Sequence, residues 1–334
     1  MPPTITVIVP CYNEQATIRG LLDAVLAQTY PLEQMDVVIS DGLSTDGTRE
    51  VIDAFQREHP DLPVQVVDNT ARTIPSGVNR AIEAARGEII VRLDAHSMPY
   101  PDYVARCVQA LTEGRGDNVG GVWEIRPGAS TWAAESIAAA AAHPLGVGDA
   151  MYRLAPSAGP VDTVPFGAFR RELIERIGKY DETLLSNEDY EFNTRVRQSG
   201  RTVWLDPAIR SVYFSRSTFG ALARQYWRYG FWKLRMLRRY PSTLRWRQAL
   251  PPAFVLSLAG LLLLGLWLYP FLWLLGAEIL LYLSVMLLAG FRAAQKRHKP
   301  LLAIGLPLAI ATMHLAWGSG FLWSLLSSLV KKNG

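Results

Sequence analysis

The stretch Ile5-Thr-Val-Ile-Val-Pro-Cys-Tyr-Asn-Glu14 decides how the chain begins to fold. Ile5–Val9 is rich in β-branched residues, as buried strands are, and the polar run Pro10-Cys-Tyr-Asn-Glu14 ends it. Apolar residues then recur with helix spacing within residues 14–28, at Ile18, Leu21, Leu22, Val25 and Leu26. We therefore expect a buried strand followed by an amphipathic helix.

The same alternation continues along the chain. Further strands are predicted at 37–39, 64–67 and 88–93, and helices at 48–58, 76–85 and 102–111. Alternating strands and helices predict an α/β domain of the Rossmann-like kind, with a mostly parallel sheet covered by helices on both faces. In such sheets ligands bind at the carboxyl ends of the strands.

Polar clusters follow three of these strands. Besides Pro10-Cys-Tyr-Asn-Glu14 they are Asp41-Gly-Leu-Ser-Thr-Asp46-Gly-Thr and Asp94-Ala-His96. Asp46 is most economically explained as a helix N-cap, and Asp41-Gly42 can be a plain turn. A carboxylate and an imidazole two residues apart after a strand can face one divalent ion, so Asp94 and His96 are candidates for metal or phosphate binding, and a local turn is the less favoured alternative.

Several other sites are poorly supported. No G-x-G-x-x-G follows the first strand, and no G-x-x-x-x-G-K-[ST] occurs in the sequence, which argues against dinucleotide oxidoreductases and P-loop enzymes. Two cysteines cannot form a disulfide scaffold or a four-thiolate metal site, and they suit a reducing compartment. The sequence still allows a nucleotide site in which a metal bridges the phosphates and is held by hard oxygen ligands such as that of Asp94.

The charges divide the chain into two parts. Residues 1–215 contain 29 of the 30 Asp and Glu, whereas nine Lys and Arg and no acid lie between Arg216 and Arg247. The pI of 9.1 therefore comes from the C-terminal third, which is also the most apolar part. This pattern indicates a membrane protein and argues against nucleic-acid binding.

Two apolar stretches are long enough to cross a membrane. Leu250–Phe291 contains one charged residue, Glu278, and Tyr269-Pro270 divides it into two spans of sufficient length. Residues 300–330 carry no Asp, Glu, Lys or Arg and are predicted to form a third span. Because it contains Gly318 and Gly320, this span could also be a broken or re-entrant helix. Buried helices of a soluble protein are the less favoured alternative.

The topology follows from a basic loop at 292–299, which we expect on the cytoplasmic side. The N-terminus offers no apolar run of signal-peptide length, so residues 1–215 should share that side. The predicted organisation is thus a domain at 1–215, a basic and aromatic interfacial helix at 216–249, and about three transmembrane helices at 250–330. The predicted location is the inner (plasma) membrane, which the chain crosses several times.

Taken together, the motifs resemble the inverting glycosyltransferases of family 2, which have the GT-A fold, over about residues 4–215. The resemblance rests on the three clusters above and on Asn187-Glu-Asp189-Tyr-Glu, in their order and spacing. Within the family the chain is most similar to bacterial exopolysaccharide glucosyltransferases of the succinoglycan type. That narrower similarity rests on Arg92-Leu-Asp-Ala-His96, Val164-Pro-Phe-Gly167 and His314-Leu-Ala-Trp-Gly-Ser-Gly320.

The resemblance implies a binding site for a UDP-sugar and a divalent metal, Mn²⁺ or Mg²⁺. The residues implied for the nucleotide-sugar are Pro10, Tyr12, Glu14, Asp41, Arg72 and Asp94. The family's Asp-x-Asp motif, which binds metal and diphosphate, reads Asp94-Ala95-His96 here, so His96 replaces a carboxylate. Imidazole suits Mn²⁺ better than Mg²⁺.

The resemblance also implies that Asp189 is the catalytic base, with Glu188 near the diphosphate or acceptor and Glu188 or Glu191 as possible substitutes. An acidic helix start capped by Asn187 is the alternative. Gln225-Tyr-Trp-Arg228-Tyr229 is similar to the family's Gln-x-x-Arg-Trp motif, which implies acceptor or diphosphate contacts for Gln225 and Arg228. Membrane adhesion alone explains this basic, aromatic segment equally well.

The implied function is transfer of a sugar, glucose by resemblance, to a polyprenyl-diphosphate-linked saccharide, with formation of a β-linkage in exopolysaccharide synthesis. A polyprenyl-phosphate sugar synthase and a processive synthase are alternatives, although three spans are few for a polymer channel. A catalytically silent nucleotide-binding scaffold is the alternative from another class, and His96 is the feature that favours it. The implied partners are a UDP-sugar, a polyprenyl-linked acceptor and membrane lipids, without nucleic acid. The sequence leaves the oligomeric state open.

Overall fold

The computed structural model describes residues 2–154 and 157–330. The chain forms two compact units, which we call the N-terminal unit, residues 1–124 and 150–213, and the C-terminal unit, residues 125–149 and 214–334. The C-terminal unit thus includes a segment, 125–149, that is inserted in sequence within the N-terminal unit. The two units are described separately below.

The N-terminal unit is built on a sheet whose first strands are parallel. β1 (Ile5–Cys11) lies between β2 (Met35–Asp41) and β4 (Ile89–Arg92), and β3 (Val64–Asp68) pairs with β2. Beyond β4 the pairing becomes antiparallel, through β8 (Ala168–Arg170) and β6 (Asn118–Pro127). Among the described residues the full order is β3-β2-β1-β4-β8-β6-β9-β5, where β5 is Met98–Pro99 and β9 is Val203–Ser215, and β7 (Gly159–Pro160) pairs with β9. The expected α/β fold class is confirmed, but only four of these strands form the parallel part.

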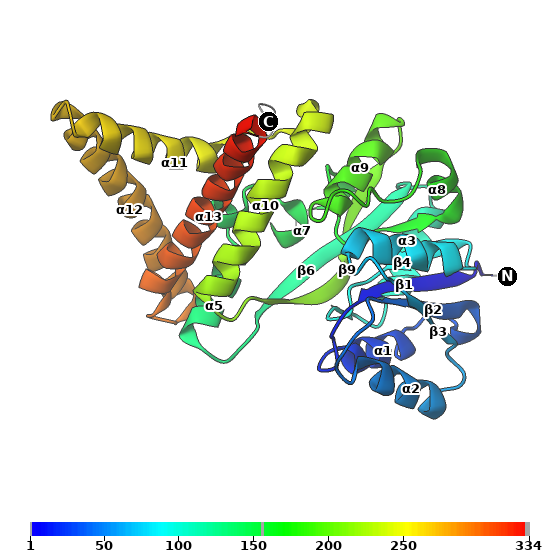
Figure 1. Cartoon of the computed structure of the whole chain (residues 1–334). Helices are drawn as coiled ribbons and strands as arrows, with labels where there is room; N and C mark the ends of the chain where they lie inside the picture. The colour runs from blue at the N-terminus through cyan, green and yellow to red at the C-terminus, as the bar shows by residue number, and fades with distance from the viewer. Residues whose placement is uncertain (1, 155–156, 331–334) are drawn as a thin grey trace. The chain divides into compact units, whose positions relative to one another are not determined.

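Helices cover both faces of the parallel strands (Figure 1). Side chains alternate along β1, so that Val7 and Val9 pack into one buried cluster with α1 (Ile18–Leu26) and α2 (Thr48–Glu58). Ile8 points to the other face and packs with α3 (Ile74–Ala84) and α9 (Glu188–Gln198). α4 (Tyr103–Thr112) adds to the first cluster, and α7 (Met151–Leu154) and α8 (Arg171–Ile177) complete the unit. Because both faces are buried, the polar ends of the strands are left as the site for a ligand.

The C-terminal unit is helical. Three of its helices are long and apolar enough to cross a membrane, namely α11 (Trp246–Gly265), α12 (Pro270–Arg297) and α13 (Leu302–Val330). α11 ends and α12 begins around Tyr269-Pro270, as predicted. α10 (Phe219–Arg239) packs along α13, and α5 (Trp132–Ala141) and the short α6 (Pro144–Val147) also contact α13 (Figure 1).

α13 is one continuous helix, so the broken or re-entrant form that its glycines left open is not what the structure has. The glycines serve close packing instead. A Cβ at Gly320 would lie 2.1 Å from the carbonyl oxygen of Trp227 on α10, and one at Gly318 would lie 2.5 Å from that of Pro251 on α11. Small residues at such positions let helix backbones approach.

The predicted basic loop at 292–299 is mostly helix, which corrects its boundaries. α12 continues to Arg297, and the turn is made by His298, whose φ of +53° ends the helix in the left-handed region. Lys296 and Arg297 favour this extension, because cations at a helix C-terminus interact well with the helix dipole.

Candidate active site

The loops after β1 and β2 are joined by hydrogen bonds at the carboxyl edge of the parallel strands. The backbone N–H of Asn13 donates to Ser44 Oγ at 2.8 Å, and the N–H of Thr45 donates to Asn13 Oδ1 at 2.8 Å. Asn13 has a φ of +53°, which asparagine tolerates better than most residues. The first two predicted clusters therefore form one edge of the site.

Asp41 is fully buried beneath this edge. Its carboxylate accepts hydrogen bonds from the Ser44 backbone at 3.0 Å and the Ser44 hydroxyl at 2.5 Å, and it pairs with Arg49 Nε at 2.7 Å. Arg49 also pairs with Asp68 at 2.6 Å. Asp41 thus holds the loop in place, and a bound nucleotide would meet its carboxylate only by displacing one of these partners.

Tyr12 and Arg72 form an exposed surface nearby. The Arg72 guanidinium lies 5.9 Å from the centre of the Tyr12 ring, which is 44% exposed. The ring packs over Gly42, where a Cβ would come within 3.0 Å of it. Pro10 packs against Gly77 in the same way. An exposed aromatic face of this kind suits stacking of a nucleotide base.

Glu14 and His96 meet across the site. His96 Nδ1 lies 3.0 Å from Glu14 Oε1, and the Thr17 hydroxyl donates to Glu14 Oε2 at 2.5 Å. The predicted metal ligand His96 is therefore joined to a residue predicted for the nucleotide-sugar.

The centre of the site is Arg92, the last residue of β4. Its side chain is 1% exposed and pairs with three carboxylates: Asp94 at 3.3 Å, Glu188 at 3.3 Å, and Asp189, which it contacts most closely. Asp94 follows β4, whereas Glu188 and Asp189 form the first turn of α9. Residues 94 and 189, far apart in sequence, are thus joined through one buried guanidinium.

This surrounding changes the acidity of Asp189. Burial raises the pKa of its carboxyl to about 7, the Arg92 guanidinium opposes that rise, and the carboxylates of Glu188 and Asp94 add to it. A carboxyl that titrates near neutral pH can accept a proton from a substrate and later release it. Asp189 has the acidity of a general base.

Asp94 and His96 fit a divalent metal only in part. Among the described residues, no group of three or more His, Cys, Asp or Glu side chains is placed to hold an ion. Mg²⁺ and related ions are commonly held by one or two protein ligands together with substrate phosphates. Asp94 supplies a hard oxygen and His96 a nitrogen, so these residues fit an ion whose other ligands come from a diphosphate.

Two predicted residues lie in the other unit. Gln225 and Arg228 are on α10, where Gln225 donates to the Tyr229 hydroxyl at 2.8 Å and Arg228 is exposed. The side chains that the structure brings together in the N-terminal unit are therefore those of Pro10, Tyr12, Glu14, Asp41, Arg72, Asp94, His96, Glu188 and Asp189.

Sequence analysis missed Arg92, Ser44 and Arg49 as site residues. For Arg92 there was a signal, since an arginine that ends the apolar run Ile89-Ile-Val must be paired if the strand is buried. Ser44 and Arg49 gave no comparable signal, because serine and arginine are common in loops and on exposed helices.

Asp46 and Asn187 show how the two helix starts are made. The prediction of Asp46 as the N-cap of α2 is wrong by one position, because Gly47 is the N-cap; Asp46 precedes it and accepts a hydrogen bond from the backbone N–H of Thr48, the first helical residue, at 3.1 Å. Asn187 holds the N-cap position of α9 with a left-handed φ of +66°. This conformation turns the chain so that Glu188 and Asp189 begin the helix beside Arg92.

Comparison with protein families matches residues 6–178 to Glycosyl transferase family 2. The chain is 31% identical to the succinoglycan biosynthesis protein ExoA of Rhizobium meliloti (strain 1021), over 96% of this chain and 94% of that protein. It is 26% identical to the dolichyl N-acetyl-alpha-D-glucosaminyl phosphate 3-beta-D-2,3-diacetamido-2,3-dideoxy-beta-D-glucuronosyltransferase of Methanococcus voltae, over 96% of this chain and 97% of that protein.

Among solved structures, the chain is similar to the mannosyltransferase PcManGT from Pyrobaculum calidifontis, determined in complex with GDP-Man and Mn²⁺. The TM-score is 0.62 at 24% identity, and the match covers 97% of this chain and 88% of that one. This likeness supports the GT-A-like fold, with its mixed sheet followed by helices.

Proposed function

Because the chain belongs to glycosyl transferase family 2, we propose that it moves a sugar from a UDP-sugar to a polyprenyl-diphosphate-linked saccharide, with inversion at the anomeric carbon. The transferred sugar is glucose and the product is an exopolysaccharide precursor with a β-linkage. The protein spans the inner membrane, with its N-terminal unit in the cytoplasm. The relatives named for succinoglycan biosynthesis and for a dolichyl-phosphate-linked acceptor support this choice of pathway and acceptor class.

The observation that carries the proposal is the cluster of Asp94, Glu188 and Asp189 around Arg92 at the carboxyl edge of the parallel strands. Asp189 Oδ takes the proton of the acceptor hydroxyl as that oxygen attacks the anomeric carbon. The bond from the anomeric carbon to the β-phosphate oxygen breaks, and UDP leaves with the electron pair. Inversion requires one base and no covalent intermediate, so a second nucleophile is unnecessary.

The remaining residues bind and orient the donor. Tyr12 stacks on the uracil, with Arg72 beside it, and Asp41 fixes the loop against which the base lies. Asp94 and His96 are the residues that would hold Mn²⁺ or Mg²⁺, and a bound ion would supply positive charge to stabilise the leaving diphosphate. A mannosyltransferase of similar fold was determined with GDP-Man and Mn²⁺, which supports a divalent metal in general terms.

Arg92 has a positioning role. Its guanidinium pairs with the Asp189 carboxylate. The positive charge favours the ionised form of Asp189, whereas burial favours the neutral acid. Gln225 and Arg228 on α10 bind the acceptor diphosphate, for which cationic and amide donors are suited.

The test is release of the nucleoside diphosphate by the full chain in lipid, UDP from a panel of UDP-sugars and GDP from GDP-mannose, with Mn²⁺ or Mg²⁺. Each donor is tried alone, with a polyprenyl-diphosphate saccharide and with bare polyprenyl phosphate. We expect stimulation by the diphosphate-linked saccharide, and Asp189→Asn to lower the rate about 10²- to 10⁴-fold while binding of UDP persists. Asp53→Asn, which removes an exposed carboxylate from α2, is the matched control and should be fully active.

The other outcomes decide between the alternatives. Stimulation by bare polyprenyl phosphate alone would replace the proposal with a polyprenyl-phosphate sugar synthase. Long polymers made from the donor without a lipid-linked saccharide would indicate a processive enzyme. Tight UDP binding with no release from any pairing would favour the catalytically silent scaffold.

A further inference from the structure

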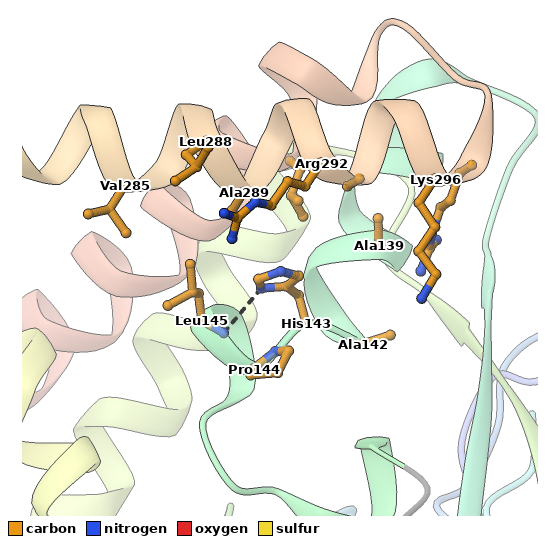
Figure 2. Close-up of a pocket in the computed structure, with 13 residues that line it drawn as sticks. Ala139, Ala142, His143, Pro144, Leu145, Val285, Leu288, Ala289, Arg292 and Lys296 are labelled. Atoms are coloured by element: carbon orange, nitrogen blue, oxygen red, sulfur yellow. Dashed lines mark hydrogen bonds between the residues drawn. The ribbon is translucent and has the colours of Figure 1, made fainter.

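A cavity of about 470 Å³ lies within the C-terminal unit, and the reaction proposed above makes no use of it. One wall is a single face of α12, and the opposite wall is the segment that joins α5 to α6 (Figure 2). Ligand sites in proteins commonly have volumes of about 300–1,000 Å³, so the cavity has room for a small headgroup.

The α12 wall is apolar at one end and positively charged at the other. Residues three or four apart share a helix face, and the face that lines the cavity is apolar at Val285, Leu288 and Ala289 and cationic at Arg292 and Lys296 (Figure 2). With a rise of about 1.5 Å per residue, the two ends of this face are about 16 Å apart. An apolar wall that leads to a pair of cations matches the outline of one acyl chain below a phosphate.

No carboxylate among the described residues pairs with the cations of this wall. Among the described residues that line the cavity there is no Asp or Glu, and Arg292, Lys296 and Arg297 form no ion pair in the described part of the chain. The next cation, Lys299, pairs with Glu135 at 2.8 Å. Uncompensated cations that share one cavity with a basic helix end favour an anionic ligand.

His143 adds a neutral donor to the opposite wall. Its Nδ1 accepts the backbone N–H of Leu145 at 3.2 Å, which places the proton of the neutral ring on Nε2 (Figure 2). Burial and the nearby Arg297 lower the pKa of the ring, so it stays neutral at pH 7. A neutral imidazole can donate one hydrogen bond to a phosphate oxygen without further positive charge.

The wall that carries His143 is held firmly. Leu145 O accepts from His314 Nε2 at 2.8 Å, and His314 Nδ1 in turn faces the Tyr282 hydroxyl at 3.0 Å. These bonds connect the α5–α6 segment to α13 and α12. The wall opposite the exposed Arg292 and Lys296 is therefore fixed to two neighbouring helices.

We propose that this cavity binds the phosphate of an anionic glycerophospholipid, with Arg292 and Lys296 at the headgroup and Val285 and Leu288 along an acyl chain. The lipid would act as a structural ligand that joins α12 to the α5–α6 segment. The proposal concerns a site other than that of the sugar acceptor, and it does not depend on the reaction proposed above.

The experiment uses the full chain, delipidated in a neutral detergent, with dioleoyl phosphatidylglycerol as the probe. Native mass spectrometry counts bound lipid, and thermal unfolding reports the change in Tm. We expect one phosphatidylglycerol per chain and a raised Tm, with much weaker binding of phosphatidylcholine that has the same chains. R292A/K296A should weaken phosphatidylglycerol binding roughly tenfold or more, because it removes both cations that attract the anionic headgroup.

Two further variants separate the cavity from charge in general. R224A/R238A removes two exposed cations from α10 and so changes the net charge by the same amount as R292A/K296A. It should bind phosphatidylglycerol as the unmodified chain does. Ala289→Trp fills the cavity without a change of charge and should lose the lipid. Comparison of the lipid-free Tm values shows whether each variant is folded.

Four results would overturn the proposal. R292A/K296A or Ala289→Trp, folded as judged by Tm, could bind phosphatidylglycerol as well as the unmodified chain. R224A/R238A could lose binding to the same extent, which would leave only a diffuse charge effect. Glycerol 3-phosphate could bind as tightly as the lipid, which would make this a site for soluble phosphates. Polyprenyl phosphate could displace phosphatidylglycerol at a lower concentration, which would assign the cavity to the acceptor.

Discussion

At the scale of single residues, Arg92 links the fold to the chemistry. A guanidinium taken out of water is costly unless it is paired, and Arg92 meets this requirement with three carboxylates. Its Nε has no hydrogen-bond partner in the described part of the chain, so the pairing is made by the two terminal nitrogens. The side chain also lies 5.6 Å from the centre of the buried Tyr180 ring, which limits its movement.

The first prediction concerns loss of this cation. Arg92→Met leaves three carboxylates close together without a counter-charge, and breaking a buried ion pair in this way costs about 3–5 kcal/mol. For a protein of this size we expect Tm to fall by roughly 10 °C. Arg57→Met, which removes an exposed cation from α2, is the control and should change Tm little. Equal Tm values for the two variants would show that Arg92 is not needed for stability.

The second prediction concerns pH. Asp189 must be ionised to act as a base, and its pKa is raised to about 7, so kcat/KM should fall about tenfold per unit as the pH drops below that value. Glu188 contributes to the rise, because its carboxylate disfavours a second negative charge nearby. Glu188→Gln should therefore lower the pKa of Asp189 and move the acid limb of the pH–rate profile to lower pH.

The profile of Asp53→Asn provides the reference, because that variant removes a carboxylate without contact with the site. A limb that stays in place in Glu188→Gln, or moves to higher pH, would contradict the assignment of Asp189 as the titrating base.

Much of the site could be predicted because its polar residues lie at or just after the ends of apolar strands. Asp41 ends β2, Asp94 and His96 come shortly after β4, and parallel strands bring their carboxyl ends to one edge. The carboxylate at 189 needed the family resemblance, since an acidic first turn is also what an ordinary helix prefers. That Asp41 would be engaged by Ser44 and Arg49 was not predictable, because it depends on the course of two loops.

At the scale of elements, glycines decide where helices of the C-terminal unit touch. A Cβ at Gly230 on α10 would lie 2.0 Å from the carbonyl oxygen of Trp317 on α13, a distance at which the two helices must separate. A Cβ added at Gly276 on α12 would have no neighbouring heavy atom of the described residues within 4 Å. The two positions form a matched pair, since both are helical glycines and only one is at a helix contact.

The third prediction uses this pair. Gly→Ala inside a helix gains up to about 1 kcal/mol from propensity, so Gly276→Ala should leave Tm unchanged or raise it slightly. Gly230→Ala should lower Tm by roughly 5 °C, because overpacking of a tight contact costs about 1–3 kcal/mol. Thermal unfolding of both variants in the same detergent is the measurement. The close packing of α10 on α13 would be refuted by a Gly230→Ala protein as stable as the Gly276→Ala protein.

Strong periodicity explains which elements were predictable. The helix expected at 48–58 coincides with α2, and the first four strands lie where the alternation put them. The antiparallel strands escaped prediction because β8 has three residues and β6 contains Gly120-Gly121, which carry no strand signal. A Cβ at Gly121 would lie 1.9 Å from the Ile209 carbonyl oxygen on β9, so a contact distant in sequence selects that residue.

At the scale of the whole molecule, the division of charge agrees with the division into units. Acids concentrate in the N-terminal unit, whereas the C-terminal unit has an excess of cations, among them Lys296 and Arg297 at the end of α12. Basic loops stay on the cytoplasmic side of a membrane, so the turn at 298–301 between α12 and α13 should lie there. Three spans then place the α11–α12 turn on the opposite side.

The fourth prediction tests this topology with single cysteines. Leu268→Cys in the α11–α12 turn should react with a membrane-impermeant maleimide in spheroplasts, whereas His298→Cys and Gln65→Cys should react only in inverted vesicles. Background labelling should be small, since Cys11 and Cys107 are buried. Gln65 is exposed on β3 and reports the side of the N-terminal unit.

The pattern of labelling separates three arrangements. If His298→Cys and Gln65→Cys both react in spheroplasts, the whole topology is inverted, and a cytoplasmic UDP-sugar could not reach the site. If only Gln65→Cys does so, the number of spans before the turn at 298 is not two. If all three react only in inverted vesicles, the α11–α12 turn lies on the same side as the turn at 298, and the interpretation of α12 as a helix that crosses the membrane is wrong.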